Sequence, residues 1–113
     1  MQSSVCRRLF PPLKVLLDDD HHKVVCNNRI VALSPAEYRL VHALWQQRER
    51  SWQSDGRVPP LISIRALAQT ADVPVAQVQR LISRANQKLA AHALLVISIR
   101  TYGYELRHFS EVQ

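Results

Sequence analysis

The sequence predicts a single α+β domain in which a small antiparallel sheet precedes three helices and a β-hairpin follows them. Short β-branched runs joined by turn residues lie near the start of the chain. Apolar residues at helical spacing fill the middle, and a second pair of strand-like runs surrounds a glycine near the end. With 113 residues the chain is long enough for one hydrophobic core and too short for two.

The N-terminal segment contains three short apolar runs that are separated by turn residues. Residues 13–17 and 23–26 flank an acidic and histidine-rich turn, and residues 29–33 follow the pair Asn27–Asn28. Asparagine tolerates the positive φ angle of a tight turn, so the second and third runs are predicted to form a hairpin. We therefore expect a small antiparallel sheet over residues 13–33.

Residues 34–48 carry the clearest helix signal. Ser34 and Glu37 have the spacing of a capping box, and Pro35 between them fits the first helical position. Apolar residues then follow at the helical period, namely Leu40, Val41, Leu44 and Trp45. We expect this helix to bury that face against the other elements.

A helix-turn-helix pattern is predicted after the first helix. Residues 49–61 contain Ser, Asp-Gly and Pro-Pro and indicate a loop, with Trp52 anchored on the body of the domain. Ser63 then caps a short second helix, and a third helix follows over residues 75–91. Only the tight turn at 72–74 joins the two helices, and the second helix of such a unit commonly enters the major groove of DNA.

The C-terminal segment is predicted to be a β-hairpin. Residues 94–99 are rich in β-branched side chains, and residues 104–106 form the return strand. Gly103 is one of only two glycines and lies where the turn needs one. An arginine at such a tip can enter a narrow A·T-rich minor groove. We predict this contact for Arg100, which stands beside Thr101.

A helix-turn-helix followed by such a hairpin is a winged helix-turn-helix, and we predict this architecture for residues 13–107. Residues 1–12 are polar and basic and end in two prolines, so we expect a flexible basic arm there. Residues 108–113 are assigned to a tail. Cys6 and Cys26 lack metal-binding spacing and are interpreted as reduced thiols, while a disulfide between them remains open.

The charge distribution indicates a polyanionic partner. The net charge of +6 is typical of domains that bind nucleic acid, and no Asp or Glu lies between residues 73 and 104. A solvated helix face usually mixes charge signs, whereas the outer face of the third helix is cationic and rich in glutamine. Arginine pairs with guanine and glutamine with adenine. We therefore predict major-groove contacts from Gln77, Arg80, Ser83, Arg84 and Gln87.

The order of elements and three local motifs resemble the winged-helix DNA-binding domain of OmpR/PhoB-type response regulators. The motifs are the opening of the first helix at Leu33–Leu40, the recognition helix at Val78–Leu89, and the wing at Ser98–Tyr104. Together with the N-terminal sheet, the resemblance covers residues 13–107. It implies binding of double-stranded DNA and regulation of transcription by a bacterial-type regulator.

The resemblance implies roles for recognition-helix residues that match family positions. Arg84 matches an arginine that contacts bases, and Ser83 and Gln87 match neighbours that contact bases or phosphates. We add Lys88 as a contact to the DNA backbone. The chain departs from the family at residues 85–87, where Ala-Asn-Gln stands in place of the common Leu-Arg-Lys.

The resemblance also implies roles in the wing. Arg100 matches the wing arginine of the minor groove, and Ser98 matches a hydroxyl near phosphate. Tyr104 matches an aromatic residue that packs at the base of the wing. Thr101, which replaces the first wing glycine of the family, is added as a backbone contact.

Further partners follow from the resemblance and from size. Family members can contact RNA polymerase or another regulator, although the loop between helices two and three that makes the polymerase contact is nearly absent here. We expect a module without a receiver domain. One module contacts too little DNA for strong specificity, so dimeric or tandem binding on DNA is expected.

The sequence indicates a binding protein rather than an enzyme. Residues 18–22 offer metal-ligand side chains, but adjacent residues rarely converge on one ion, so we interpret them as a polar turn. No glycine-rich phosphate loop and no paired nucleophile and base occur. We predict no catalytic residue, metal site or cofactor. No run of about 18 apolar residues is present, so we expect no membrane span and a cytoplasmic, nucleoid-associated protein.

A second interpretation stays open at this point. Winged helices also serve as protein-interaction modules, because a fold does not fix a function. The same basic face, or exposed apolar residues, would then contact the partner protein. The apolar candidates are Leu81, Trp52 and Tyr102.

Overall fold

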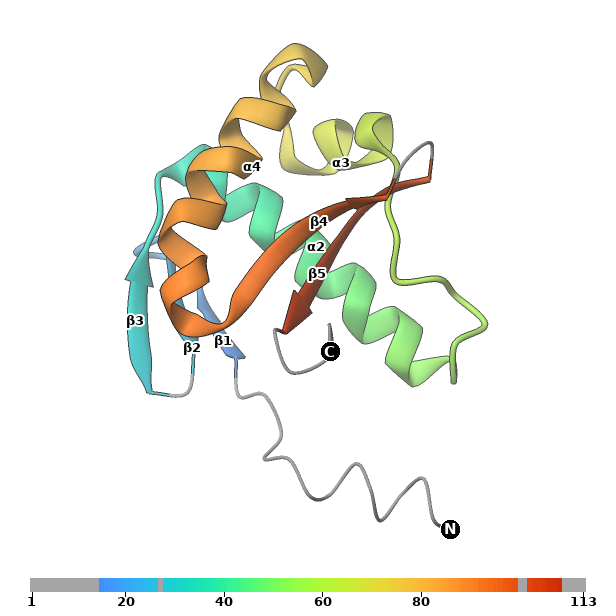
Figure 1. The fold of residues 1–113 in the computed structure, drawn as a ribbon, viewed down its shortest axis with the longest axis horizontal. Coiled ribbons are helices and arrows are strands. Elements are labelled where there is room, and N and C mark those ends of the chain that lie inside the picture. Colours follow the sequence, from blue (N-terminus) through green and yellow to red (C-terminus); the bar gives the residue numbers. More distant parts are fainter. Residues whose placement is uncertain (1–14, 27, 100–101, 109–113) are drawn as a thin grey trace, which may run out of the picture.

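The computed structural model describes residues 15–26, 28–99 and 102–108. The predicted basic arm lies outside the described residues, as do Arg100 and Thr101. Figure 1 shows the order of elements, which is β1 (Val15–Asp18), β2 (Lys23–Cys26), β3 (Arg29–Ala32), α2 (Pro35–Gln53), α3 (Ile64–Ala71), α4 (Val75–Leu89), the 3₁₀ turn η1 (Ala90–His92), β4 (Leu94–Ile99) and β5 (Gly103–His108). The predicted α+β winged helix-turn-helix is confirmed.

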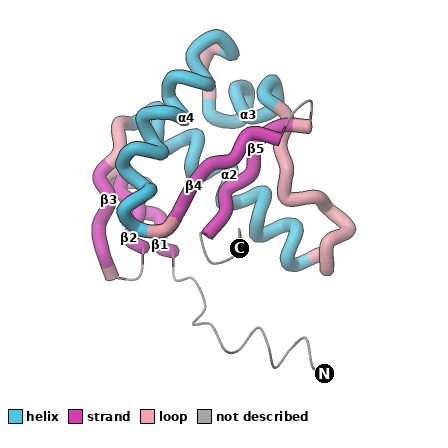
Figure 2. The backbone as a smooth tube through the Cα atoms, in the orientation of Figure 1, coloured by secondary structure: helices cyan, strands magenta, loops and turns pink. Residues whose placement is uncertain are grey.

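The N-terminal sheet is antiparallel with the strand order β1-β2-β3, as the sequence predicts (Figure 2). Its inner face contributes Val24 and Val31, which pair across β2 and β3, to the core. Cys26 is a free, buried thiol whose Sγ–H donates to the carbonyl of His92 at 3.5 Å. Burial raises the pKa of this thiol above its ordinary value, so it remains protonated at neutral pH.

Helix α2 begins with the predicted capping box. The Ser34 hydroxyl accepts a hydrogen bond from the Glu37 amide at 3.2 Å, and the Glu37 carboxylate accepts one from the Ser34 amide at 2.9 Å. These two bonds satisfy orphan donors of the first turn. The predicted apolar stripe is buried, and it includes Leu40, Val41, Leu44 and Trp45.

The predicted end of α2 at residue 48 is wrong, because the helix continues to Gln53. The Arg48 guanidinium lies 4.7 Å from the ring centroid of Trp52 and 6.0 Å from that of Trp45. Arg48 Nη1 also donates to the carbonyl of Leu106 in β5 at 2.9 Å. Cation–π contacts at helical spacing thus stabilise the extra turn. Trp52 consequently lies on a helix rather than in a loop, and 56% of its surface is exposed.

Helices α3 and α4 form the predicted helix-turn-helix. The Ser63 hydroxyl caps α3 by accepting from the Ala66 amide at 3.2 Å, and Asp72 turns the chain with a φ of 56°. Helix α4 ends at Leu89, two residues before its predicted end, because residues 90–92 tighten into η1. Helices α3 and α4 are therefore joined by the short turn that the sequence predicts.

The core lies between α2, the helix-turn-helix and the wing. Helix α4 packs against α2, α3, β3 and β4 at once, so its buried face is wider than one apolar stripe. For this reason Leu81 is only 6% exposed, and its assignment as an exposed apolar residue is wrong. Among the described residues, no helix combines the length and apolar composition that crossing a membrane requires.

The wing has a longer second strand and one more strand-like contact than the sequence predicts. Strands β4 and β5 pair antiparallel, and β5 extends over residues 103–108 rather than 104–106. Ile62, in the segment before α3, pairs with Tyr104 through hydrogen bonds of 3.0 and 2.9 Å. Strand β5 therefore lies between β4 and the chain at Ile62. Gly103 has a φ of 133°, and a Cβ placed there would lie 2.2 Å from the Ile62 carbonyl oxygen.

Candidate nucleic-acid interface

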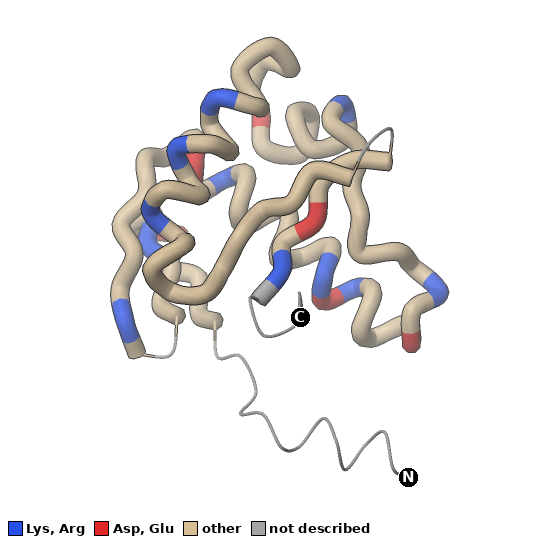
Figure 3. The backbone as a smooth tube through the Cα atoms, in the orientation of Figure 1, with Lys and Arg blue, Asp and Glu red and all other residues tan. Residues whose placement is uncertain are grey.

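Helix α4 presents a polar row to solvent. All five residues that the sequence predicts for the major groove are exposed on it, namely Gln77, Arg80, Ser83, Arg84 and Gln87. Four of them follow at intervals of three or four residues, so their side chains lie along one face of the helix. Figure 3 shows basic positions on successive turns of α4 and no acidic position on this helix.

Lys88 continues the basic positions of α4 but has a partner inside the protein. Its Nζ lies 2.6 Å from a carboxylate oxygen of Glu37 at the start of α2. The Glu37 side chain is 4% exposed, whereas that of Lys88 is 44% exposed. Part of the Lys88 charge is therefore used to neutralise a buried carboxylate. Sequence reasoning found the capping role of Glu37 and missed this second partner.

Two effects oppose each other at Glu37. Burial raises the pKa of its carboxyl, but the hydrogen bonds from Lys88 and from the Ser34 amide hold the pKa below its ordinary value. A lowered folded-state pKa stabilises the protein above the unfolded-state pKa of about 4.3, and this contribution disappears as the pH falls through the folded-state value. The pair is thus an acid-sensitive link between α2 and α4.

Glu37→Gln is expected to lower the free energy of unfolding by about 2 kcal/mol at pH 7, because it removes the charge that faces Lys88. The difference from wild type should shrink as the pH falls from the unfolded-state pKa of about 4.3 through the lower folded-state pKa, because the wild-type carboxyl then becomes protonated and loses its charge. Urea unfolding between pH 7 and pH 3 measures this. Glu49→Gln, on the exposed surface of the same helix, is the matched control. A difference that stays constant across this pH range would contradict the assignment.

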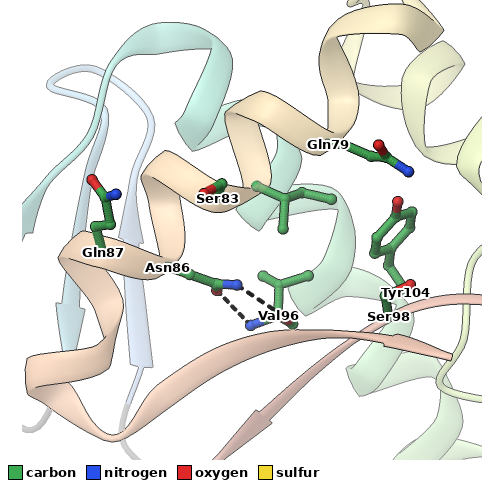
Figure 4. A pocket seen from close by; sticks show the side chains of 8 residues that line it. Gln79, Ser83, Asn86, Gln87, Val96, Ser98 and Tyr104 are labelled. Atoms are coloured by element: carbon green, nitrogen blue, oxygen red, sulfur yellow. Dashed lines mark hydrogen bonds between the residues drawn. The ribbon is translucent and has the colours of Figure 1, made fainter.

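A groove separates α4 from the wing. Its volume is about 530 Å³, and it is lined by Gln79, Ile82, Ser83, Asn86, Gln87, Val96, Ser98 and Tyr104 (Figure 4). A second hollow of about 280 Å³ shares three of these residues and extends toward the start of α3 and the wing. Most of the polar lining groups are amides and hydroxyls, and none of the lining residues carries a carboxylate.

Asn86 connects the two walls of this groove. Its Oδ1 accepts a hydrogen bond from the Val96 amide at 2.8 Å, and its Nδ2 donates to the Val96 carbonyl at 3.0 Å (Figure 4). Tyr104 is 6% exposed and pairs with Ser98 near the turn of the wing. The described part of the wing also carries Tyr102, which is 69% exposed.

The structure brings some of the predicted site residues together and keeps others apart. Ser83, Gln87 and Ser98 line the groove between α4 and the wing. The other predicted helix residues, Gln77, Arg80 and Arg84, are exposed on α4 and are not among the residues that line it. Sequence reasoning missed Gln79 and Asn86. The available signal was the spacing of residues 79, 83 and 86, which makes a second polar row beside the first.

Comparisons with known proteins give structural matches only. No protein-family model and no curated protein sequence matches the chain. The DNA-binding domain of response regulator AdeR, solved in complex with an intercistronic region, aligns with a TM-score of 0.63 at 19% identity. This alignment covers 83% of the present chain and 93% of the AdeR domain.

A second solved structure is a streptococcal redox sensor of a family evolved from two-component response regulators. It aligns with a TM-score of 0.61 at 16% identity over 95% of the present chain, which spans 48% of that sensor's length. At these identities the matches establish the shared fold. The chain therefore has the winged helix-turn-helix fold of response-regulator DNA-binding domains, which its resemblance to OmpR/PhoB-type effector domains predicts.

Proposed function

We propose that this chain binds double-stranded DNA with sequence preference and regulates transcription. The observation that carries the proposal is the exposed row on α4, which combines Arg80 and Arg84 with amide side chains and lacks any acid. The AdeR domain, which has the same fold, was solved in complex with an intercistronic region, and this supports a DNA ligand for the fold.

The dimensions of α4 suit a major groove. The helix has 15 residues and is about 22 Å long, and a major groove about 12 Å wide admits an α-helix. Arg80 and Arg84 are one turn apart, so both can face the same stretch of base edges or phosphates. Gln77 and Gln87 stand at the two ends of this row and offer amides that can pair with adenine.

The wing would hold the adjacent backbone and minor groove. The groove beside α4 offers amide and hydroxyl groups to a phosphodiester strand, and its lining carries no carboxylate that would repel one. Ser98 lies on the wing wall of this groove. The minor-groove contact of Arg100 and the backbone contact of Thr101 stay predictions from the sequence, as do RNA polymerase contact and tandem binding.

Arg84→Ala tests the proposal most directly. If Arg84 contacts a base, the variant should bind about 5- to 150-fold more weakly, which corresponds to about 1–3 kcal/mol, and should relax specificity at one position. Arg50→Ala is the matched control, since it removes the same charge from an exposed position of α2. Genomic DNA fragments retained at about 150 mM salt provide the motif, and fluorescence anisotropy on that motif provides the affinities.

Each outcome of this experiment decides a part of the proposal. A motif that is enriched by wild type and lost with Arg84→Ala supports sequence-specific reading. Equal weakening on all sequences reassigns Arg84 to a phosphate contact. Absence of retained DNA contradicts the proposal, and the exposed Trp52 and Tyr102 would then direct the search toward a protein partner.

A further inference from the structure

Asn86 satisfies the main-chain N–H and C=O of Val96, which point away from the partner strand β5. In an antiparallel sheet, the N–H and C=O of one residue point to the same side of the strand. Both groups of Val96 bond to the Asn86 amide, so they point away from β5 and toward α4. Tyr104 confirms the alternation, because its own N–H and C=O point to the opposite edge, where they bond to Ile62.

The side-chain amide of Asn86 therefore bonds the two groups of Val96 that the main chain of one more strand would otherwise bond. Its carbonyl oxygen and its NH₂ group match the donor and acceptor of Val96 one to one. Unpaired edges of sheets need such a cover. Two hydrogen bonds to the N–H and C=O of one residue fix direction as well as distance, which apolar contacts cannot do.

Asn86 and Val96 lie next to residues that line the groove on its helix side and on its wing side. The residue directly precedes Gln87 and lies one turn after Ser83, and both of these line the groove on the helix side. Val96 lies two residues before Ser98, which lines the groove on the wing side. The hydrogen-bonded pair thus joins α4 to the wing among the residues that line the groove (Figure 4).

We propose that Asn86 is a positioning residue that locks the wing strand β4 to helix α4 and thereby sets the separation of the two DNA-contacting elements. The part that concerns DNA rests on the proposed function. When the helix and the wing are held at a fixed separation, both can contact DNA in one binding event. The complex then does not lose the conformational entropy that ordering a mobile wing on DNA would cost.

The lock can be tested in the free protein by hydrogen exchange of the Val96 amide, followed by NMR. Asn86→Ala removes the acceptor, so the exchange of Val96 should become about five- to tenfold faster, as expected for one lost hydrogen bond. Amides of α2 report any change in overall stability and serve as the internal reference. Gln87→Ala, at the neighbouring exposed position, is the control and should leave Val96 unchanged. Equal exchange of Val96 in wild type and Asn86→Ala would overturn the proposal.

The consequence for DNA can be tested with two duplexes. The short duplex carries only the motif. The long duplex adds about half a helical turn of DNA for the wing to contact, on whichever side of the motif the addition raises the affinity of the wild-type protein. Asn86→Ala should lose most of this gain and keep its affinity for the short duplex within about twofold. Gln87→Ala should lose affinity for both duplexes and keep the gain. Equal losses by Asn86→Ala on both duplexes would reduce Asn86 to a structural residue.

The two experiments separate the failure of this proposal from that of the proposed function. Absence of DNA binding by wild type contradicts the proposed function, and the exchange of Val96 then still decides whether Asn86 locks the wing. Asn86→Asp provides a further check on the free protein. Its carboxylate can accept from the Val96 amide but faces the Val96 carbonyl without a donor, so it should restore only part of the protection of Val96.

Discussion

Gly103→Ala is expected to lower the free energy of unfolding by about 3–5 kcal/mol. The added Cβ would lie 2.2 Å from the Ile62 carbonyl oxygen and 2.7 Å from its carbon, both of which are backbone atoms. The φ of 133° is a conformation that alanine rarely adopts. Both strains act on the pairing of Ile62 with Tyr104, so the attachment of the wing to the rest of the domain should be lost first.

The matched control for this substitution is Gly56→Ala. Gly56 also has a positive φ, of 82°, but a Cβ placed there would meet no atom within 4 Å. It should therefore show only the conformational strain, of roughly 1 kcal/mol. Urea unfolding followed by circular dichroism measures both variants. Equal destabilisation by the two alanines would mean that close packing of the Ile62 backbone against Gly103 has no energetic importance.

Leu44→Ala is expected to destabilise the protein by about 2–5 kcal/mol. Leu44 lies in the middle of α2, is fully buried, and belongs to the core that α2 shares with α3, α4 and β5. The loss combines the removed apolar surface with the cavity that remains after partial relaxation. The protein would then approach the limit of stability of a small domain.

Leu16→Ala makes the same chemical change on the outer face of the N-terminal sheet, where Leu16 is 68% exposed. Its expected effect is within about 0.5 kcal/mol, since exposed substitutions away from special features change stability little. The two variants are compared by their midpoints of urea unfolding, with the same dependence of the unfolding free energy on urea concentration used for both. A similar loss in both variants would contradict the assignment of Leu44 to the centre of the core.

The parts of the fold that the sequence predicts are those with local causes. The start of α2 follows from the capping box of Ser34 and Glu37, and the start of α3 follows from the cap at Ser63. The N-terminal sheet follows from three short runs and their turn residues. These signals lie within a few residues of the structure that they produce, so one sequence is enough to find them.

The parts that the sequence does not predict depend on residues far apart in the chain. Near the end of α2, Arg48 donates to the Leu106 carbonyl in β5, 58 residues further along the chain, in addition to its local contacts with Trp45 and Trp52. The ion pair of Glu37 with Lys88 joins residues from two helices. The Ile62 pairing is equally non-local. No periodicity announces such contacts, because they depend on how the elements pack.

Much of the candidate site could be predicted by placing the sequence of α4 on a helical wheel. The exposed row that contains Arg80 and Arg84 was predicted as it is found. The role of Asn86 was not, because an asparagine on a helix is as compatible with solvent as with a bonded partner, and Val96 becomes its partner only when the wing folds back on α4.

The pairing of Ile62 with Tyr104 also constrains the order in which the chain can fold. The whole helix-turn-helix lies between these two residues, so closing this contact early would require a long loop to be ordered first. The wing should therefore dock after the main kinetic barrier, once the helices have packed. Stopped-flow measurements should then show that Gly103→Ala accelerates unfolding and leaves the refolding rate nearly unchanged, whereas Leu44→Ala alters both rates. The wing, which is proposed to contact the minor groove, should therefore be the last element to dock during folding and the first to detach during unfolding.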